Sequence, residues 1–201
     1  METAARPHPD RIQLDVCYSV ATMHGSQDSP LARGHEARRQ RHPDEARTLF
    51  AEAIDLYQRH NDPPRLAQSF IGLGQTERDL RNVDAALAHY EDAIAIYRTL
   101  NEPLMLAHTV RHVGDILQDQ AKLDLAEPCY REALDIYRCH PETPPLDLAN
   151  TLRGYALLKG AQGRAQEASL LWLEARTLYM ETSVAAGVTE SERQIARLTK
   201  Q

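Results

Sequence analysis

Three side chains that could bind a metal ion lie close together in the sequence. His108, His112 and Asp115 follow one another at intervals of four and three residues, so on a helix they would share one face. Imidazole and carboxylate groups are ligands for zinc and related ions. No further histidine or carboxylate is placed to complete the site, and such a triplet arises easily in a chain with nine histidines. The sequence therefore predicts neither a metal site nor a cofactor.

Other motifs with chemical potential lack the surroundings that they would need. Gly72-Leu73-Gly74 is neither preceded by a strand pattern nor followed by Gly-Lys-Ser/Thr, as a phosphate-binding loop requires. Cys17, Cys129 and Cys139 are odd in number and match no Cys-x-x-Cys spacing, which argues against a disulfide framework and a zinc site. The sequence has no nucleophile elbow and no HExxH. We therefore expect a protein that is not an enzyme.

The charge of the chain restricts its partners. The 201 residues include 29 acidic and 23 basic side chains, for a net charge of -6. Nonspecific nucleic-acid binding needs a surplus of Lys and Arg, and anionic membranes attract an acidic chain poorly. The start METAARPHPD lacks a signal-peptide pattern, and no stretch approaches the ~18 apolar residues of a spanning helix. We expect a cytoplasmic protein that binds neither nucleic acid nor membranes.

An internal repeat of 40 to 42 residues organises the chain. Large aromatic residues recur at these intervals as Phe50, Tyr90, Tyr130 and Trp172. A tyrosine follows each of them seven residues later, as Tyr57, Tyr97, Tyr137 and Tyr179. An alanine lies four residues before each aromatic of the first set and another lies three residues after it. This spacing predicts one apolar face of a helix in every unit.

A second helix is predicted upstream of each of these. Its marker is a small residue twelve positions before the first alanine of the unit: Gly34, Gly74, Gly114 and Ala156. Glycine inside a helix costs up to ~1 kcal/mol relative to alanine, so its recurrence predicts a close contact between two backbones. Proline-containing segments near 61–64, 101–103 and 142–145 separate the units. Each unit is therefore predicted to be a hairpin of two helices.

These residues resemble the tetratricopeptide repeats, whose second helix carries an Ala-aromatic-Ala triplet. Their first-helix pattern is looser here, as in Phe70-x2-Leu73-Gly74 and Leu152-x2-Tyr155-Ala156. The long unit is similar to the repeats of kinesin light chains and of bacterial signalling proteins. The resemblance covers about residues 30–199. It implies an all-α fold: an α-solenoid of about four helix-turn-helix hairpins in a right-handed superhelix, with a C-terminal capping helix.

The resemblance also divides the chain into segments. Residues 1–29 form an N-terminal segment whose apolar residues fit a strand as well as a degenerate packing helix. The array covers 30–187, with units at about 30–62, 63–102, 103–144 and 145–187. Pro30 and Arg33 stand where the second unit has Phe70 and Leu73, which predicts a short first helix. A capping helix is predicted over 188–201, because Thr189-Glu190-Ser191-Glu192 has the form of a capping box.

By the resemblance, the first helices of the hairpins line a concave groove that binds a protein or peptide. The groove face is predicted to carry Gln68, Gln75, Arg78, His108, Arg111, Asp115, Gln118, Asn150 and Arg153. Arg111 and Arg153 are equivalent positions and should stack as two guanidinium forks suited to a partner with acidic groups. We expect an interaction scaffold. The alternative is a regulatory or effector-sensing module of a bacterial signalling system, which a closed apolar pocket would favour.

Overall fold

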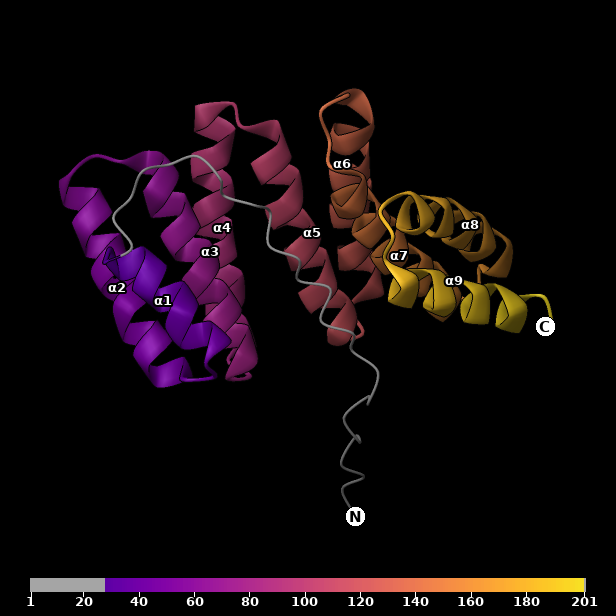
Figure 1. Cartoon of the computed structure of the whole chain (residues 1–201), viewed down its shortest axis with the longest axis horizontal. Helices are drawn as coiled ribbons and strands as arrows, with labels where there is room; N and C mark the ends of the chain where they lie inside the picture. The colour runs from indigo at the N-terminus through magenta and orange to yellow at the C-terminus, as the bar shows by residue number, and fades with distance from the viewer. Residues whose placement is uncertain (1–27, 201) are drawn as a thin grey trace, which may run out of the picture.

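The computed structural model describes residues 28–200, and within this range the chain forms helices and no strand. The helices run in the order α1 Pro30–Arg39, α2 Pro43–Arg59, α3 Pro63–Asp79, α4 Val83–Leu100, α5 Pro103–Asp119, α6 Leu123–Cys139, α7 Pro145–Ala161, α8 Ala165–Glu181 and α9 Ala185–Leu198. Consecutive helices pair into four hairpins, α1/α2 to α7/α8, which lie side by side along the molecule (Figure 1). The predicted all-α solenoid of four hairpins and one further helix is confirmed.

Two predictions concern the beginning of the array. The first helix is short, as expected: α1 has 10 residues and α3 has 17. The N-terminal segment predicted over residues 1–29 lies almost entirely outside the described residues.

None of the helices in the described part is both long and apolar enough to cross a membrane.

Each hairpin reverses through one residue with a left-handed backbone. Three of these residues are Arg41, Arg81 and Ala121, with φ of 61°, 67° and 57°, and the fourth is Gly163 with φ of 75°. The residue after each of them donates its backbone N–H to a carbonyl five positions earlier, as His42 does to Ala37 at 2.9 Å. This pattern ends a helix while satisfying its last carbonyls. The short turn keeps the two helices of each hairpin antiparallel and in contact.

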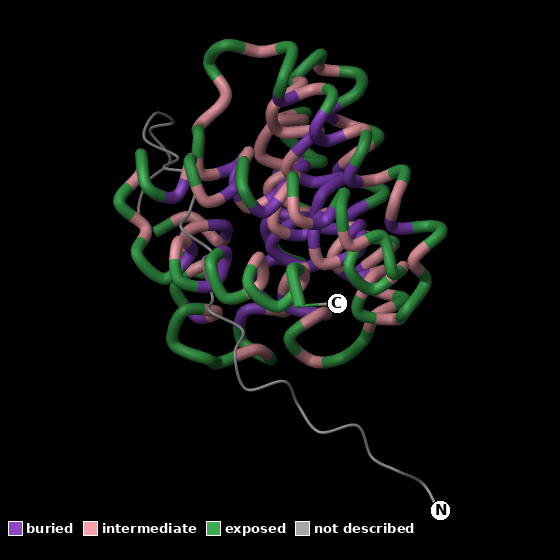
Figure 2. The backbone as a smooth tube through the Cα atoms, turned by 90° about the vertical axis from the view of Figure 1, so that its right-hand side faces the viewer, coloured by how far each residue is buried: buried purple, intermediate pink, exposed green. Residues whose placement is uncertain are grey.

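The aromatic residues of the repeat are all buried, and the buried positions of the chain gather in the interior of the stack (Figure 2). Phe50 is fully buried between Gly34 of its own hairpin and Gly72 of the next one. A Cβ atom at Gly72 would lie 2.3 Å from Phe50 Cε1, which is far inside van der Waals contact. The glycine track was predicted to bring two backbones together. In that track, a Cβ at Gly34 would meet the Phe50 ring at 2.9 Å, and one at Gly74 would meet the Tyr90 ring at 3.2 Å and the Ala86 carbonyl oxygen at 3.3 Å. The track therefore makes room for aromatic rings and, at Gly74, also for a backbone contact, and Gly72 is a further glycine outside it.

Replacing Gly72 with alanine is expected to lower the free energy of unfolding by about 2 kcal/mol, because the new methyl group must displace the buried Phe50 ring. Gly160 in α7 is the matched control, since a Cβ there meets nothing within 4 Å. Gly160→Ala should stabilise the protein by about 0.5 kcal/mol through its better helix propensity. Urea unfolding of both variants measures the difference. Equal effects would show that ring contact does not require the glycine at 72.

Helix α9 begins earlier than the sequence indicates. The expected capping box is wrong, because α9 starts at Ala185 after the N-cap residue Val184. The Thr189 hydroxyl donates to the carbonyl of Ala185, as inside a helix, instead of capping an N–H group. The helix therefore begins three residues before the predicted position 188, and its first turn contains Gly187, which is buried against the ring of Tyr179 in α8.

A buried hydroxyl shows that α9 has the register of a first helix. Ser69, Thr109, Thr151 and Ser191 are each fully buried and each donate to the carbonyl four residues earlier. The positions at which α7 has buried Ala149, Leu152 and Ala156 are held in α9 by exposed Thr189, Glu192 and Ala196. The face on which a further helix would pack is therefore largely polar in α9.

Candidate partner-binding groove

A cavity of about 1020 Å³ lies where the inner helices of the hairpins meet α9. Its walls come mostly from the C-terminal parts of α3 and α5, from α7, and from the last turns of α9. Two buried aromatic residues, Tyr130 of α6 and Trp172 of α8, lie directly beneath its lining. We call this cavity the groove. It is formed by the first helices of the hairpins, the surface on which the sequence placed the binding residues.

Six of the nine predicted residues line the groove: Arg78, Arg111, Asp115, Gln118, Asn150 and Arg153. The other three lie outside it. Gln75 accepts a hydrogen bond from Arg38 Nη1 at 2.8 Å, and His108 faces Asp147 of α7. Gln68 is half-buried in the first half of α3. The helical spacing thus identified the inner face of each helix, but the groove occupies only part of that face.

The two equivalent arginines already have carboxylate partners within the chain. Arg111 Nη1 donates to Asp115 Oδ2 at 2.7 Å. Arg153 makes two parallel hydrogen bonds to Glu190 of α9, from Nε at 2.7 Å and from Nη2 at 2.9 Å. Such bidentate pairs are among the stronger side-chain contacts. The two guanidinium groups are therefore not the open forks that the sequence predicted, because Asp115 of α5 itself and Glu190 of α9 supply the acids.

The groove is basic although the chain is acidic. Six arginines and four carboxylates line it, in a chain with a net charge of -6. The arginines are Arg78, Arg81, Arg111, Arg153, Arg193 and Arg197, and the acids are Asp79, Asp115, Asp119 and Glu190. Within residues 28–200, the exposed Arg81 and Arg197 form no ion pair. The positive charge at the surface of the groove therefore exceeds what its own acids neutralise.

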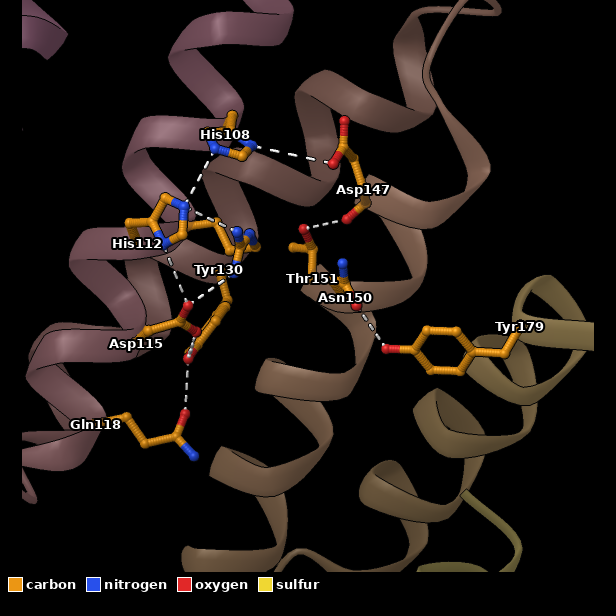
Figure 3. Close-up of polar contacts among 10 residues, drawn as sticks. His108, His112, Asp115, Gln118, Tyr130, Asp147, Asn150, Thr151 and Tyr179 are labelled. Atoms are coloured by element: carbon orange, nitrogen blue, oxygen red, sulfur yellow. Dashed lines mark hydrogen bonds and ion pairs between the residues drawn. The ribbon is translucent and has the colours of Figure 1, made fainter. Parts of the chain in front are cut away.

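A buried polar network supports the floor of the groove (Figure 3). The Tyr130 hydroxyl donates to Asp115 Oδ1 at 2.7 Å and lies 2.8 Å from Gln118 Oε1. His112 is 2% exposed and stacks on Tyr90 with ring centres 5.8 Å apart. Burial and then the charge of Arg111 lower the pKa of His112 well below its ordinary value. Burial and then Asp115 raise the pKa of Tyr130. At neutral pH His112 is therefore neutral and Tyr130 keeps its proton.

The histidines of this network do not form a metal centre. His108 Nε2 and His112 Nε2 face each other at 3.1 Å in a hydrogen bond. No group of three or more His, Cys, Asp or Glu side chains that could hold a metal ion occurs in the part of the chain that the structure describes. Cys129 and Cys139 are free thiols. The spacing of the triplet is helical, but its side chains bond to one another and to arginine.

Several groove residues were missed by the analysis of the sequence. Glu190 falls in the predicted capping box, and the helical spacing of the first helices does not extend the groove to Arg193 and Arg197 of α9. Arg193 and Arg197 are four residues apart on one helix, a spacing that gives them a common face. This spacing indicates that the two arginines share one helix face. It places them in the groove only once α9 is known to occupy the position of a first helix beside α7.

Comparisons with known proteins agree with the geometry. The family model of the tetratricopeptide repeat matches residues 31–99, and a second tetratricopeptide repeat model matches residues 112–138. No curated protein matches the chain significantly. Similar solved structures include BtubC (BKLC) from P. vanneervenii, with 19% identity and a TM-score of 0.70 over 77% of this chain and 63% of BtubC. This chain therefore spans less than two thirds of the length of BtubC.

A putative kinesin light chain from Podosopora anserina, with nearly identical TPR-like repeats, has a similar structure. Its identity is 16% and its TM-score is 0.68, over 89% of this chain and 88% of that one. A point variant of the same protein has 15% identity and a TM-score of 0.69, over 87% of this chain and 85% of that one. Identities this low show the fold alone. The two family models and the four aromatic-alanine hairpins show that the chain belongs to the tetratricopeptide repeat family.

Proposed function

We propose that this protein is a scaffold that binds an acidic segment of a protein partner in the groove. Tetratricopeptide repeats generally serve as interaction scaffolds, and the proposal adds the surface and the chemistry of the partner. One observation carries it: six arginines surround a cavity of about 1020 Å³ in a chain of net charge -6. A basic surface on an acidic molecule is a local property that attracts and orients an acidic ligand.

The composition of the groove favours a peptide over a small effector. Pockets for small molecules are mostly apolar and usually occupy roughly 300 to 1,000 Å³. This groove is at the upper end of that range, and arginine, aspartate and amide side chains make up much of its lining. An extended segment with several carboxylates can use such a surface along its length. The charged lining therefore supports a protein partner more than the alternative of an apolar effector pocket.

Different arginines have different tasks in this proposal. Arg81 lies in the turn between α3 and α4, Arg197 lies on α9, and both are exposed. In the proposal these two arginines contact the carboxylates of the partner. Arg111 and Arg153 are engaged by Asp115 and Glu190, so they hold the walls of the groove in place.

The double variant Arg81→Glu/Arg197→Glu is expected to weaken binding of a fluorescent Asp/Glu-rich peptide by at least about tenfold, which corresponds to ~1.4 kcal/mol. The measurement is a fluorescence anisotropy titration. The wild-type affinity should also fall as salt rises, because exposed charges are screened over ~10 Å at 0.1 M. The thermal stability should change little, since substitutions of exposed side chains usually alter stability by less than ~0.5 kcal/mol.

The matched control reverses two arginines on the outer helices, Arg59 of α2 and Arg131 of α6, both of which are exposed. This Arg59→Glu/Arg131→Glu variant carries the same change in net charge and should bind the peptide within about twofold of wild type. If the control loses the peptide while the groove variant keeps it, the binding surface is the convex side and the proposal is wrong. Binding that both variants keep at all salt concentrations would also contradict it.

A further inference from the structure

Exposed apolar side chains gather on one helix of the array. Four large hydrophobic side chains are exposed in the described part of the chain, and three of them belong to α8: Leu170 at 68%, Leu173 at 39% and Met180 at 60%. Their spacing of three and seven residues places them along one stripe of the helix, outside the buried face that carries Trp172 and Tyr179. Such a concentration of exposed apolar side chains is a candidate interaction surface.

The other outer helices do not have this stripe. The repeat gives each position of α8 an equivalent one, 42 residues earlier in α6 and a further 40 residues earlier in α4. For two of the three side chains these equivalents are charged: Arg131 and Glu91 for Leu173, and Arg138 and Arg98 for Met180. Helix α8 therefore departs from the repeat by having apolar side chains where the preceding outer helices have charges.

The charged equivalents of Met180 connect one outer helix to the next. Arg98 Nη2 of α4 donates to Glu132 Oε1 of α6 at 3.1 Å, and Arg138 Nη2 of α6 donates to Glu174 Oε2 of α8 at 2.8 Å. Met180 therefore lies on the edge of α8 at which the next outer helix of the row would pack. Among the described residues α8 is the last outer helix, and α9 follows it.

A continued array does not explain the apolar edge. Each outer helix packs on the first helix of its own hairpin, so a further outer helix beside α8 would also have to pack on α9. The face of α9 that it would use is largely polar, with exposed Thr189 and Glu192. The two surfaces that a further outer helix would contact therefore do not match each other.

The opposite end of the array offers no matching surface either. Glu52 of α2 has the position of Glu132 and Glu174, which accept the bridging arginines, and it is exposed. Docking of α2 from another copy on the edge of α8 would place this carboxylate against Met180. The carboxylate would lose water without gaining a partner, which disfavours end-to-end stacking of copies.

A second α8 does offer a complementary surface. In a contact with two-fold symmetry the same patch lies on both sides, so the three apolar side chains of each copy would cover those of the other and leave water. The acids along one border of the stripe do not oppose this contact. Glu167 and Glu174 already accept hydrogen bonds from Arg164 at 2.6 Å and from Arg138 at 2.8 Å.

We propose that two copies of this chain associate through the exposed edges of their α8 helices, with Leu170, Leu173 and Met180 of each copy at the centre of the contact. This self-association goes beyond the proposed binding function and does not rest on it. None of the three side chains lines the groove, so both grooves of the dimer stay open.

The size of the patch sets the strength of the association. Three side chains on one helix cover far less than the roughly 800 Å² per partner of a standard interface. The dimer is therefore weak, with a dissociation constant on the order of 100 µM.

Sedimentation velocity of the full chain tests the proposal, because a dimer of this strength forms between about 10 µM and about 1 mM. The double variant Leu173→Arg/Met180→Arg introduces the residues that α6 has at both positions. It should raise the dissociation constant at least about tenfold, since it places two charges in the centre of the contact.

The matched control is Ala51→Arg/Leu125→Arg, which makes the same change in charge at exposed positions of α2 and α6. It should leave the dissociation constant within about twofold of wild type. Circular dichroism should show the same helix content in all three proteins, because every substituted position is exposed.

Methyl NMR of the methionines locates the contact. The chain has four methionines, of which Met180 lies on the patch and Met105 is half-buried in α5. As the concentration rises, the Met180 methyl resonance should shift in the wild type and stay fixed in Leu173→Arg. The Met105 resonance should stay fixed in both.

Four results would overturn the proposal. The first is a wild type that remains monomeric to about 1 mM. The second is a Leu173→Arg/Met180→Arg variant that dimerises as strongly as the wild type. The third is a control variant that dissociates as readily as this double variant, and the fourth is a dimer in which the Met180 resonance does not move.

Discussion

Replacing Tyr130 with alanine is expected to lower the free energy of unfolding by about 4 kcal/mol. The Tyr130 ring is fully buried in the middle of the array, between Gly114 of its own hairpin and Gly154 of the next. Neither glycine has a side chain that could fill the space that the ring leaves. The change also removes the hydrogen bond to Asp115. Urea unfolding followed by circular dichroism measures the loss.

Tyr130→Phe separates the ring from the hydroxyl group. The phenylalanine keeps the packing between the hairpins and loses only the hydrogen bond, so it should cost about 1 kcal/mol. An alanine variant no less stable than the phenylalanine variant would show that the ring does not fill a core position. The order expected from the structure is therefore wild type, Phe, then Ala, with the larger step between Phe and Ala.

Removing the carboxylate of Glu127 is expected to cost about 3 kcal/mol, because it leaves a buried ammonium group without its main partner. Lys159 is 1% exposed, and its Nζ lies 2.5 Å from Glu127 Oε1 and 4.8 Å from the centre of the Tyr155 ring. Glu167 remains at 3.6 Å in a Glu127→Ala variant, which keeps the loss at the lower end of the range for broken buried pairs. Urea unfolding at pH 7 measures it.

The double variant Glu127→Leu/Lys159→Met is the control for this pair. Buried ion pairs can often be replaced by apolar side chains of similar size at little cost, so the double variant should recover most of the loss. A double variant as unstable as Glu127→Ala would show that packing, and not the unpaired charge, causes the effect.

The pH dependence of the free energy of unfolding provides a second check on the contribution of Glu127. Hydrogen bonds from Lys159 and Gln162 lower the pKa of Glu127 to about 2. The stabilisation by Glu127 is therefore present above its ordinary value of 4.5 and decreases as pH falls towards about 2. Glu127→Ala should lack this decrease.

The junction that contains Glu127 and Lys159 shows what the repeat in the sequence can predict about contacts between hairpins and what it cannot. Glu127 and Lys159 occupy the positions that Arg47 and Glu77 occupy between the first two hairpins, where Arg47 Nε donates to Glu77 Oε1 at 2.7 Å. The signs of the charges are reversed, and the middle junction has Leu87 and Leu117 at these positions. Alignment of the repeats identifies these positions as equivalent. It does not reveal that they meet, because they lie about 30 residues apart on different helices.

The amino-acid sequence by itself determined the helices, their pairing into hairpins and the inner face of each first helix. Burial on one side of a helix leaves a period of 3.6 residues, and a stack of similar hairpins leaves a period of 40 to 42. Both are local or repeated signals. The short α1 was also predictable, because Pro30 and Arg33 interrupt that signal.

Only the tertiary structure decided which charges are paired and where the groove lies. Glu190 meets Arg153 across 37 residues, and Asp147 meets His108 across 39, because the packing of α9 and α5 on α7 brings them together. The contact of Gly187 in the first turn of α9 with the Tyr179 ring of α8 likewise appears only in the tertiary structure. Side-chain partners of this kind depend on how neighbouring helices are inclined and spaced. A repeat pattern does not encode these quantities, because Arg111 and Arg153 hold equivalent positions and yet pair with acids from different places, Asp115 of the same helix and Glu190 of α9.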